Sequence, residues 1–302
     1  MELEKAYALC RRVAHRHGPN FSVGFRFLPR AKRQAVYATY AFCRFVDDLV
    51  DENPNTDVRE RVDRWEEELE RCYRGAPTHS ITVALADAAS CFPIPKESFA
   101  RLIEGCRMDL VKKRYATYHE LLVYSDLVAT TISTMSLSIF GYRDPAAMER
   151  GRELATAFQL TNILRDVGED AAEKDRIYLP QEELSRFGVS EHDLKTRRAT
   201  SAFVELMRFQ VERVRGLYRR AEPLLDLIEP DCRRCTSLMG AVYCRILEKI
   251  GEEGYPVLQR RIGLSLTNKL GLVTGAMVSS RPSWIEELSV QRSRGDPRKE
   301  TN

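Results

Sequence analysis

Two stretches of the sequence place oxygen-bearing side chains at four-residue intervals directly after apolar residues. The first, "FCRFVDDLVDE" at 42–52, carries Asp47 and Asp51. The second, "QLTNILRDVGEDAAEKDRIYLP" at 159–180, repeats the step with Asn162, Asp166 and Asp170. Residues four apart lie on one face of a helix. Each stretch therefore predicts a helix that carries a strip of oxygen ligands.

The chemistry that such strips allow is the binding of a divalent cation together with a diphosphate. Like charges at this spacing destabilise a helix unless a cation neutralises them. Hard cations such as Mg²⁺ bind carboxylate and amide oxygens and usually keep water or phosphate oxygens as further ligands. Two facing strips therefore suit a metal-bridged diphosphate, whose other oxygens could be bound by three nearby guanidinium groups: Arg44, Arg165 and Arg176.

A solvated charged face is the ordinary interpretation of either strip taken alone. The repetition favours a shared ligand, because acids and amides in both places continue a helix whose flanking residues are apolar. Other polar side chains stand close by in the sequence: Tyr40 comes before the first strip, Gln159 comes before the second, and Tyr178 follows it.

Helical periodicity dominates the elements that must carry these residues. Apolar residues recur at three- and four-residue intervals in seven long segments: 31–51, 57–74, 96–112, 119–140, 146–172, 200–228 and 233–253. Breakers such as "ENPNTD", "FPIP" and "GYRDP" separate them, and no alternating strand pattern is convincing. The sequence therefore predicts an all-α bundle with short loops. We divide it into one domain at 1–278 and a polar, partly disordered tail at 279–302.

Charge and cysteine content narrow the class of protein. The 47 Lys and Arg residues against 44 Asp and Glu residues give a net charge of only +3, so no global field favours nucleic-acid binding. The eight cysteines show neither a disulfide framework nor a secretory leader before them, which predicts a cytoplasmic protein. Cys232 and Cys235 have the one suggestive spacing, but no second pair or nearby histidine completes a zinc site.

Membrane contact is expected to be peripheral at most. The least polar long window, 121–142, contains Asp126 and many hydroxyl groups, which a lipid-facing span tolerates poorly. The basic stretch at 258–270 could touch anionic lipid, although a solvated helix face also explains it. We therefore expect no transmembrane segment, and the sequence does not predict an oligomeric state.

The strips and their surroundings resemble the trans-isoprenyl diphosphate head-to-head synthases, the family of squalene, dehydrosqualene and phytoene synthases. "YAFCRFVDDLVDE" is similar to the first aspartate-rich motif of the family and "QLTNILRDVGEDAAEKDRIYLP" to the second. The likeness extends, in the same order over about residues 8–275, through "FRFLPRAKRQAVYATYAF", "GCRMDLVKKRYATYHEL" and "YCRILEKIGEEGYPVLQRR". It implies an isoprenoid-synthase helical bundle with a central apolar cavity.

The resemblance also implies roles for individual residues. Mg²⁺, with Mn²⁺ as an alternative, would be held by Asp47, Asp51, Asn162, Asp166 and Asp170. The prenyl diphosphate substrates would be contacted by Tyr40, Arg44, Arg165, Arg176, Tyr178, Tyr243, Phe21 and Phe25. Gln159 would line the reacting centre and, with Tyr40 and the aspartates, would be catalytic.

The implied reaction is a Mg²⁺-dependent head-to-head condensation of two geranylgeranyl diphosphates to phytoene, through a cyclopropyl diphosphate intermediate. The final cation loses a proton, so NADPH is not expected to be required. The DDLVD form of the first motif resembles the carotenoid branch. One alternative is a C15 enzyme that uses farnesyl diphosphate and makes dehydrosqualene, presqualene diphosphate or squalene. Another, of a different class, is a non-catalytic assembly factor on the same fold, which the two intact aspartate motifs argue against.

The chain departs from the family pattern in two places. Gly18 and Pro19 stand where the dehydrosqualene branch has a Ser-Lys pair, so a basic contact to diphosphate is missing or is replaced by a neighbour, Arg16 or His17. Thr130 and Ser133 stand where many relatives have glycines. Because glycine permits bending, we expect a straighter helix and a differently shaped cavity here.

Overall fold

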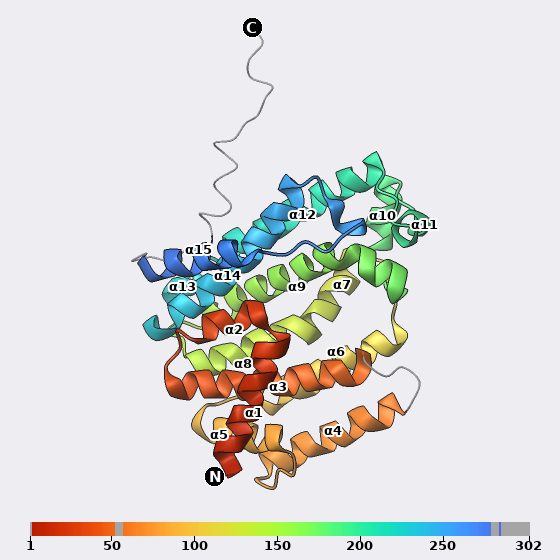
Figure 1. Ribbon diagram of the computed structural model, residues 1–302. Helices are drawn as coiled ribbons and strands as arrows, with labels where there is room; N and C mark the ends of the chain where they lie inside the picture. Colours follow the sequence, from red (N-terminus) through yellow and green to blue (C-terminus); the bar gives the residue numbers. More distant parts are fainter. Residues whose placement is uncertain (1, 52–56, 279–283, 285–302) are drawn as a thin grey trace.

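The computed structural model describes residues 2–51, 57–278 and Trp284 (Figure 1). Its α-helices are α1 Glu2–His17, α2 Pro19–Phe25, α3 Arg30–Asp51, α4 Val58–Tyr73, α5 Ser80–Cys91, α6 Lys96–Val111, α7 Tyr118–Ser125, α8 Thr131–Phe140, α9 Ala146–Glu173, α10 Gln181–Phe187, α11 Glu191–Lys195, α12 Ser201–Ala221, α13 Leu224–Leu227, α14 Pro230–Glu252 and α15 Leu266–Val278. A π-helical turn, Asp126–Thr130, joins α7 to α8, and a 3-10 turn, Pro256–Leu258, follows α14. Within the described residues no strand forms, and the only β-pairing is two isolated bridges. The predicted all-α fold is confirmed.

The helix α3 lies at the centre of one layer of the bundle. Its buried face is built from residues three or four apart: Ala35, Ala38, Ala41, Phe42 and Val46. Small alanines on this face let α1 and α5 pack closely against it, and α6 and α8 contact it as well. In Figure 1 α1, α3, α5 and α6 form the lower layer, with α8 between it and the upper layer.

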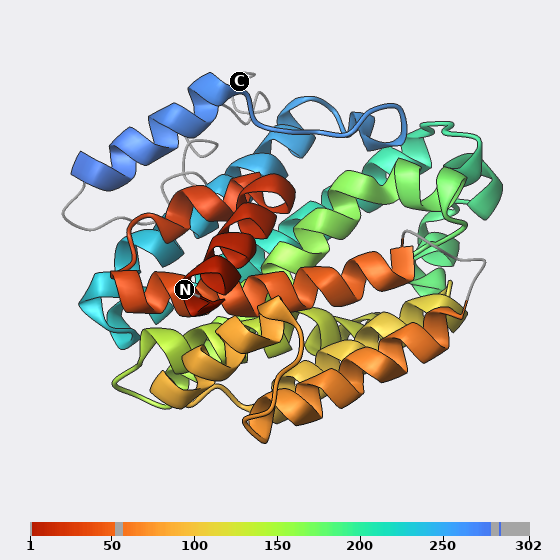
Figure 2. The same cartoon turned by 60° about the horizontal axis from the view of Figure 1, so that its bottom comes forward.

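The helix α9 is the centre of the upper layer, where it packs against α12, α14 and α8 (Figure 1). A methyl group at Gly168 would lie 2.6 Å from the carbonyl oxygen of Leu258, so a glycine is needed where the 3-10 turn crosses the helix. The C-terminal ends of α3 and α9 point toward the same side of the molecule in both Figure 1 and Figure 2. The two acidic strips therefore lie on one side of the bundle.

The predicted helix at 119–140 is not a straight α-helix. Its register changes in the π-helical turn Asp126–Thr130. The hydroxyl groups of Thr131 and Thr134 donate to backbone carbonyls four residues earlier, an interaction that often bends helices. A π-turn and hydroxyl back-bonding perturb a helix without any glycine, so the expected effect of Thr130 and Ser133, a helix straighter than in the relatives, stays a prediction.

The predicted helix at 200–228 is also interrupted. It divides at Pro223 into α12 and the short α13, Leu224–Leu227. Proline has no N–H to donate within a helix, so it ends one element and begins the next.

The continuous helical stretch Tyr118–Phe140 is the one described segment long and apolar enough to cross a membrane, with a mean hydropathy of 1.2. Within this stretch, 44% of the apolar window is buried inside the bundle. Asp126 forms an ion pair with Arg152 of α9 at 2.5 Å. One helix of this kind is weak evidence for a membrane span, because a core helix meets the same criteria of length and composition.

Trp284 packs into the groove between α12 and α14. Its side chain is fully buried, and its indole Nε1 donates to the carbonyl oxygen of Tyr218 at 3.0 Å. A methyl group at Gly240 would overlap the ring, so this glycine provides the space. The other residues of the predicted tail lie outside the described part of the chain, and the boundary at 278 stays a prediction.

Candidate active site

A cavity of about 860 Å³ lies between α3, α8, α9 and α14. Its polar wall includes Arg16, His17, Tyr40, Arg44, Asp47, Asp109, Asn162, Arg165, Tyr243, Arg261 and Lys269. Its apolar wall includes Val36, Leu102, Val128, Ile132, Leu137, Phe140, Leu154, Phe158 and Met239. Along both α3 and α9 the lining changes from apolar in the N-terminal half to charged near the C-terminal end. The predicted central apolar cavity is confirmed.

The first strip is partly neutralised by its own helix. Tyr40, Arg44 and Asp47 line the cavity on successive turns of α3. Arg44 Nη1 donates to Asp47 Oδ2 at 2.9 Å, and Arg44 Nη2 forms an ion pair with Asp48. The side chain of Asp51 lies outside the described part of the structure, so its pairing with Asp47 stays a prediction.

The second strip is held by two arginines. Gln159, Asn162 and Arg165 line the cavity on α9, and Asp166 follows Arg165. Arg165 donates to both oxygens of Asp166 at 2.9 and 2.6 Å, and Arg261 donates to the same oxygens at 2.8 and 3.1 Å. Burial raises the pKa of Asp166, but these hydrogen bonds outweigh burial and lower the pKa below its usual value. Asp166 is therefore an ionised carboxylate between two guanidinium groups.

Asp170, one turn further along α9, has a different environment. Its described ion-pair partner is Lys174, whose Nζ lies 3.5 Å from Oδ1. Burial raises the pKa of Asp170 to about 6, since Lys174 only partly offsets burial and Asp166 adds repulsion. A second cation close to this carboxylate would stabilise its charged form.

The oxygen atoms of the second strip are of the type that binds a hard cation. The described carboxylates do not, however, surround a single metal position. Among the described side chains, which do not include that of Asp51, no three of His, Cys, Asp or Glu surround one point. Asn162 Oδ1, however, is a buried acceptor with no hydrogen-bond donor among the described residues, while the same side chain bonds to Tyr243. With Asp166 and Asp170 on the next two turns, it completes a face of oxygen donors suited to Mg²⁺.

Arg176 and Tyr178 do not line the main cavity. The segment that carries them pairs with the residues after α6, where the backbone N–H of Ile177 donates to the carbonyl oxygen of Lys113 at 3.0 Å. Tyr178 Oη donates to Asp109 Oδ1 at 3.0 Å, and Arg176 Nη2 donates to the Asp109 carbonyl at 3.3 Å. Both side chains therefore bind Asp109, and it is Asp109 that lines the cavity.

Asp109 is a polar member of the wall that sequence reasoning missed. Tyr124 Oη donates to its second carboxylate oxygen at 2.9 Å. The rings of Tyr115, Tyr124 and Tyr178 pack around it with centroids 5.4 to 5.7 Å apart. In the sequence Asp109 has no acidic neighbour at four-residue spacing, and the two tyrosines that donate to it, Tyr124 and Tyr178, lie 15 and 69 residues away, so residue spacing alone does not mark it.

Two further missed residues come from the basic stretch at 258–270. Arg261 is directed at Asp166, and Lys269 of α15 lines the cavity. Interpretation of this stretch as a solvated or lipid-facing surface therefore leaves out part of its role, because at least these two side chains belong to the wall of the site.

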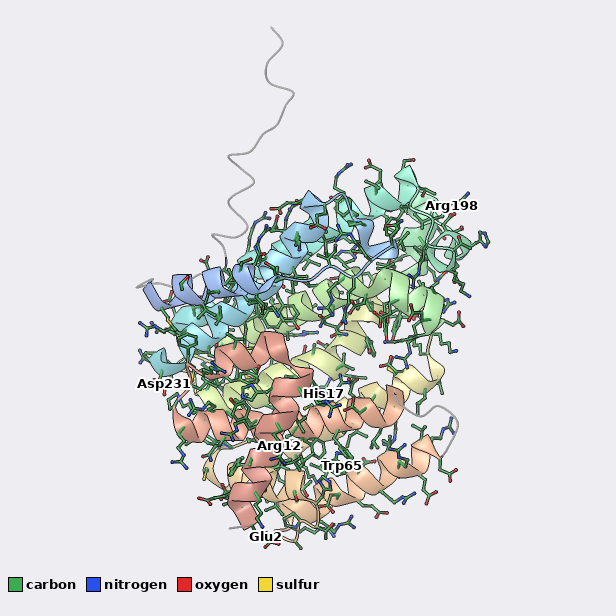
Figure 3. The ribbon with its side chains drawn as sticks, in the orientation of Figure 1. Glu2, Arg12, His17, Trp65, Arg198 and Asp231 are labelled. Atoms are coloured by element: carbon green, nitrogen blue, oxygen red, sulfur yellow. The ribbon has the colours of Figure 1, made fainter. Side chains whose placement is uncertain are left out.

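Gly18, where the sequence departs from the family pattern, lies at the junction of α1 and α2 and lines the cavity. Arg16 and His17 line the cavity, and Figure 3 shows His17 near the centre of the view, at the C-terminal end of α1. A methyl group at Gly18 would lie 2.6 Å from Tyr40 Oη, so the glycine leaves room for that hydroxyl. Replacement of the missing basic contact by Arg16 or His17 stays a prediction that this position supports.

Aromatic side chains close the wall near the charged groups. Phe25 lines the cavity with its ring centroid 6.4 Å from that of Tyr40, whereas the side chain of Phe21 lies outside the described part of α2. Tyr243 lies against Phe158 with a centroid separation of 4.6 Å. Burial raises the pKa of Tyr243 to about 12, so it is a neutral hydroxyl at physiological pH.

The chain belongs to the squalene/phytoene synthase family, whose family model matches residues 14–268. This confirms the recognition that began from the two acidic strips. The phytoene synthase of Arthrospira platensis is 37% identical over 290 residues, which cover 91% of this chain and 94% of that protein. The 15-cis-phytoene synthase of Synechococcus elongatus is 36% identical over 289 residues, with the same coverage of 91% and 94%.

Solved structures of related enzymes have the same fold. A dehydrosqualene synthase in complex with a ligand superposes with a TM-score of 0.84 at 31% identity, over 91% of this chain and 96% of that chain. The squalene synthase HpnC from Alicyclobacillus acidocaldarius gives a TM-score of 0.78 at 36% identity, over 84% and 96% of the two chains. The predicted isoprenoid-synthase bundle is confirmed.

Proposed function

We propose that the protein condenses two molecules of geranylgeranyl diphosphate head-to-head to phytoene, with release of diphosphate. Family membership and the phytoene synthase relatives bear out the prediction of a prenyltransferase of this kind, and they support the C20 substrate over the C15 alternative. The observation that carries the proposal is the gradient of polarity along α3 and α9. A substrate with a charged head and a long hydrocarbon tail matches both ends of this cavity.

We assign the diphosphate group to the charged end. Arg44, Arg165 and Arg261 present guanidinium groups there, and planar guanidinium groups bind phosphate oxygens in pairs. The hydroxyl groups of Tyr40 and Tyr243 remain protonated, because burial raises the pKa of both, and they are donors to the same oxygens. Arg176 and Tyr178 do not line this cavity and would act on the diphosphate only indirectly, by holding Asp109 in place.

We propose Mg²⁺ as the cofactor, with Mn²⁺ as an alternative. The residues that would hold it are Asp47, Asp51, Asn162, Asp166 and Asp170. When bound, it would supply neutralisation of the charge that develops on the leaving diphosphate. The buried, unpaired Asn162 Oδ1 and the raised pKa of Asp170 support this assignment.

The chain's own residues would act on the rest of the reaction. Departure of diphosphate from one substrate leaves an allylic cation, which the C2–C3 double bond of the second substrate attacks, and loss of a proton closes the cyclopropyl diphosphate. Departure of the second diphosphate then starts the rearrangement to the 1,1′-linked cation. The faces of Phe158 and Tyr243 can stabilise such cations, and the apolar wall excludes water that would capture them. Gln159, between the charged and apolar parts of α9, would lie at the reacting carbons. Loss of a proton from the rearranged cation leaves a central double bond without NADPH.

The cellular compartment and the binding partners of the enzyme are proposed from its cysteines and its net charge. All eight cysteines are free, and seven of them are buried, which suits a reducing cytoplasm. Peripheral membrane contact would suit uptake of lipid-like substrates and release of a hydrocarbon product. We propose no nucleic-acid partner, because the net charge is only +3.

Product analysis tests the proposal. The purified protein would be incubated with Mg²⁺ and either geranylgeranyl or farnesyl diphosphate, with and without NADPH, and the extracts analysed by mass spectrometry. We expect a C40 hydrocarbon from the longer substrate without NADPH. A C30 product alone would move the assignment to the C15 alternative. Absence of both product and Mg²⁺-dependent diphosphate release would favour the non-catalytic assembly factor.

A further inference from the structure

Three glycines line the described wall of the cavity, and Gly151 is the one on α9. Gly151 of α9 lines the cavity opposite Ser133 and Leu137 of α8, which line it too. A methyl group at Gly151 would lie 2.7 Å from Ser133 Oγ and 2.7 Å from Leu137 Cδ1. Any side chain at position 151 must therefore push these two flexible groups aside, and the open space available to them is the cavity.

Gly151 lies far from the charged end. It precedes Arg165 by fourteen residues of the same helix. At about 1.5 Å per residue this separation is about 21 Å along the helix axis. Leu154 and Ala155, which also line the cavity, lie about 15–17 Å from the level of Arg165 by the same rise.

These depths can be compared with the lengths of the two candidate prenyl chains. An extended chain advances about 3.5 Å for every three bonds. The sixteen-carbon main chain of a geranylgeranyl group then spans about 18 Å, and the twelve-carbon main chain of a farnesyl group about 13 Å. The longer chain therefore extends past Leu154 and ends about 3 Å short of the level of Gly151, whereas the shorter one ends between Phe158 and Ala155.

We infer that Gly151, together with Ser133, determines chain length by leaving room for the last five-carbon unit of a C20 substrate. The inference rests on the proposed function, because the diphosphate is taken to lie beside Arg165. At the deeper level Gly151, Ala155 and Ser133 leave space between the larger side chains of Leu137 and Leu154, whereas Phe158 lies closer to the charged end.

Gly151→Ala tests this inference through competition between the two substrates. Equal concentrations of farnesyl and geranylgeranyl diphosphate would be supplied with Mg²⁺, and the C40 and C30 products quantified. One methyl group in an apolar pocket changes discrimination by roughly tenfold or more. We therefore expect the C40-to-C30 ratio to fall by about tenfold in Gly151→Ala. Adding Ser133→Ala, which removes one of the two displaced groups, should restore part of the ratio.

Gly216→Ala is the matched control, because the same change on α12 meets only Arg220 Nη1 at 3.4 Å. It should leave the ratio unchanged. If Gly151→Ala fails to fold by circular dichroism, Ser133→Ile fills the same level from α8 and should lower the ratio in its place. A wild-type protein that makes C40 product, with an unchanged ratio in the folded variant, would overturn the inference. A wild-type protein that makes no C40 product would instead refute the proposed function.

Discussion

Asp166→Asn should lower both stability and turnover, and the structure separates the two effects. The carboxylate is 16% exposed and is bound by Arg165, which is 10% exposed, and by Arg261, which is 59% exposed. Breaking a buried ion pair costs about 3–5 kcal/mol of unfolding free energy, whereas an exposed pair contributes at most about 1 kcal/mol. Asparagine keeps an acceptor for Arg165. We therefore expect a loss near the lower end, about 3 kcal/mol.

Turnover of Asp166→Asn should fall further than this loss of stability explains. Removal of one group that stabilises developing charge lowers turnover by about 10²–10³-fold. The assay is Mg²⁺-dependent diphosphate release, at a temperature where circular dichroism shows the variant to be folded.

Asp193→Asn is the control for this experiment. It removes a carboxylate that is 7% exposed and paired with Arg198, which Figure 3 places at the periphery of the bundle. The control should lose stability while turnover is unchanged. If the folded Asp166→Asn protein turned over substrate as fast as this control, Asp166 would not take part in the reaction.

Three other predictions concern stability and the shape of the site. Glu68 accepts hydrogen bonds from Thr78, His79, Thr82 and Arg71; burial raises its pKa, but these bonds lower it from 4.5 to about 2. Because the folded pKa is depressed, the stability it contributes, about 3 kcal/mol, is present above pH 4.5 and is lost as the pH falls toward 2. The difference in unfolding free energy between wild type and Glu68→Gln in denaturant should shrink over that interval, and a constant difference would contradict this account. Gly18→Ser should raise KM with little change in Tm, because its side chain displaces Tyr40; an unchanged KM would show that the contact is not tight. Trp284→Ala should lower the unfolding free energy by about 3–5 kcal/mol, measured by denaturant titration, and an unchanged value would show that Trp284 is not part of the folded core.

The long helices could be predicted because their pattern is local. The segments predicted at 31–51 and 146–172 correspond to α3, Arg30–Asp51, and α9, Ala146–Glu173. Short elements carry too few residues for a periodic signal. The five-residue α11, for example, depends on a capping box between Ser190 and Asp193 rather than on periodicity.

The same distinction applies to the candidate site: residues on one helix could be predicted from the sequence, whereas contacts between distant segments could not. The strip on α9 follows from spacing alone, because residues four apart share a helix face. Arg261 lies 95 residues from the Asp166 that it contacts, so nothing in the local sequence connects them. Arg176 and Tyr178 stand near the strip in the sequence, but the pairing of Ile177 with Lys113 directs them to Asp109 instead. Nearness in the sequence therefore predicts the position of a side chain only within the same helix, and Arg176 and Tyr178 come after the end of α9.

The direction of the two central helices gives an independent reason to expect a cation. A helix C-terminus carries about half a negative elementary charge and is normally stabilised by basic residues. Neither α3 nor α9 has a basic residue in its last turn, and both carry acids there. Arg44 and Arg165 neutralise part of the charge at Asp47 and Asp166, and Lys174 pairs with Asp170, but burial keeps the pKa of Asp170 raised to about 6. A divalent cation between the strips would be stabilised by both helix ends at once, so the proposal of Mg²⁺ follows from helix direction as well as from ligand spacing.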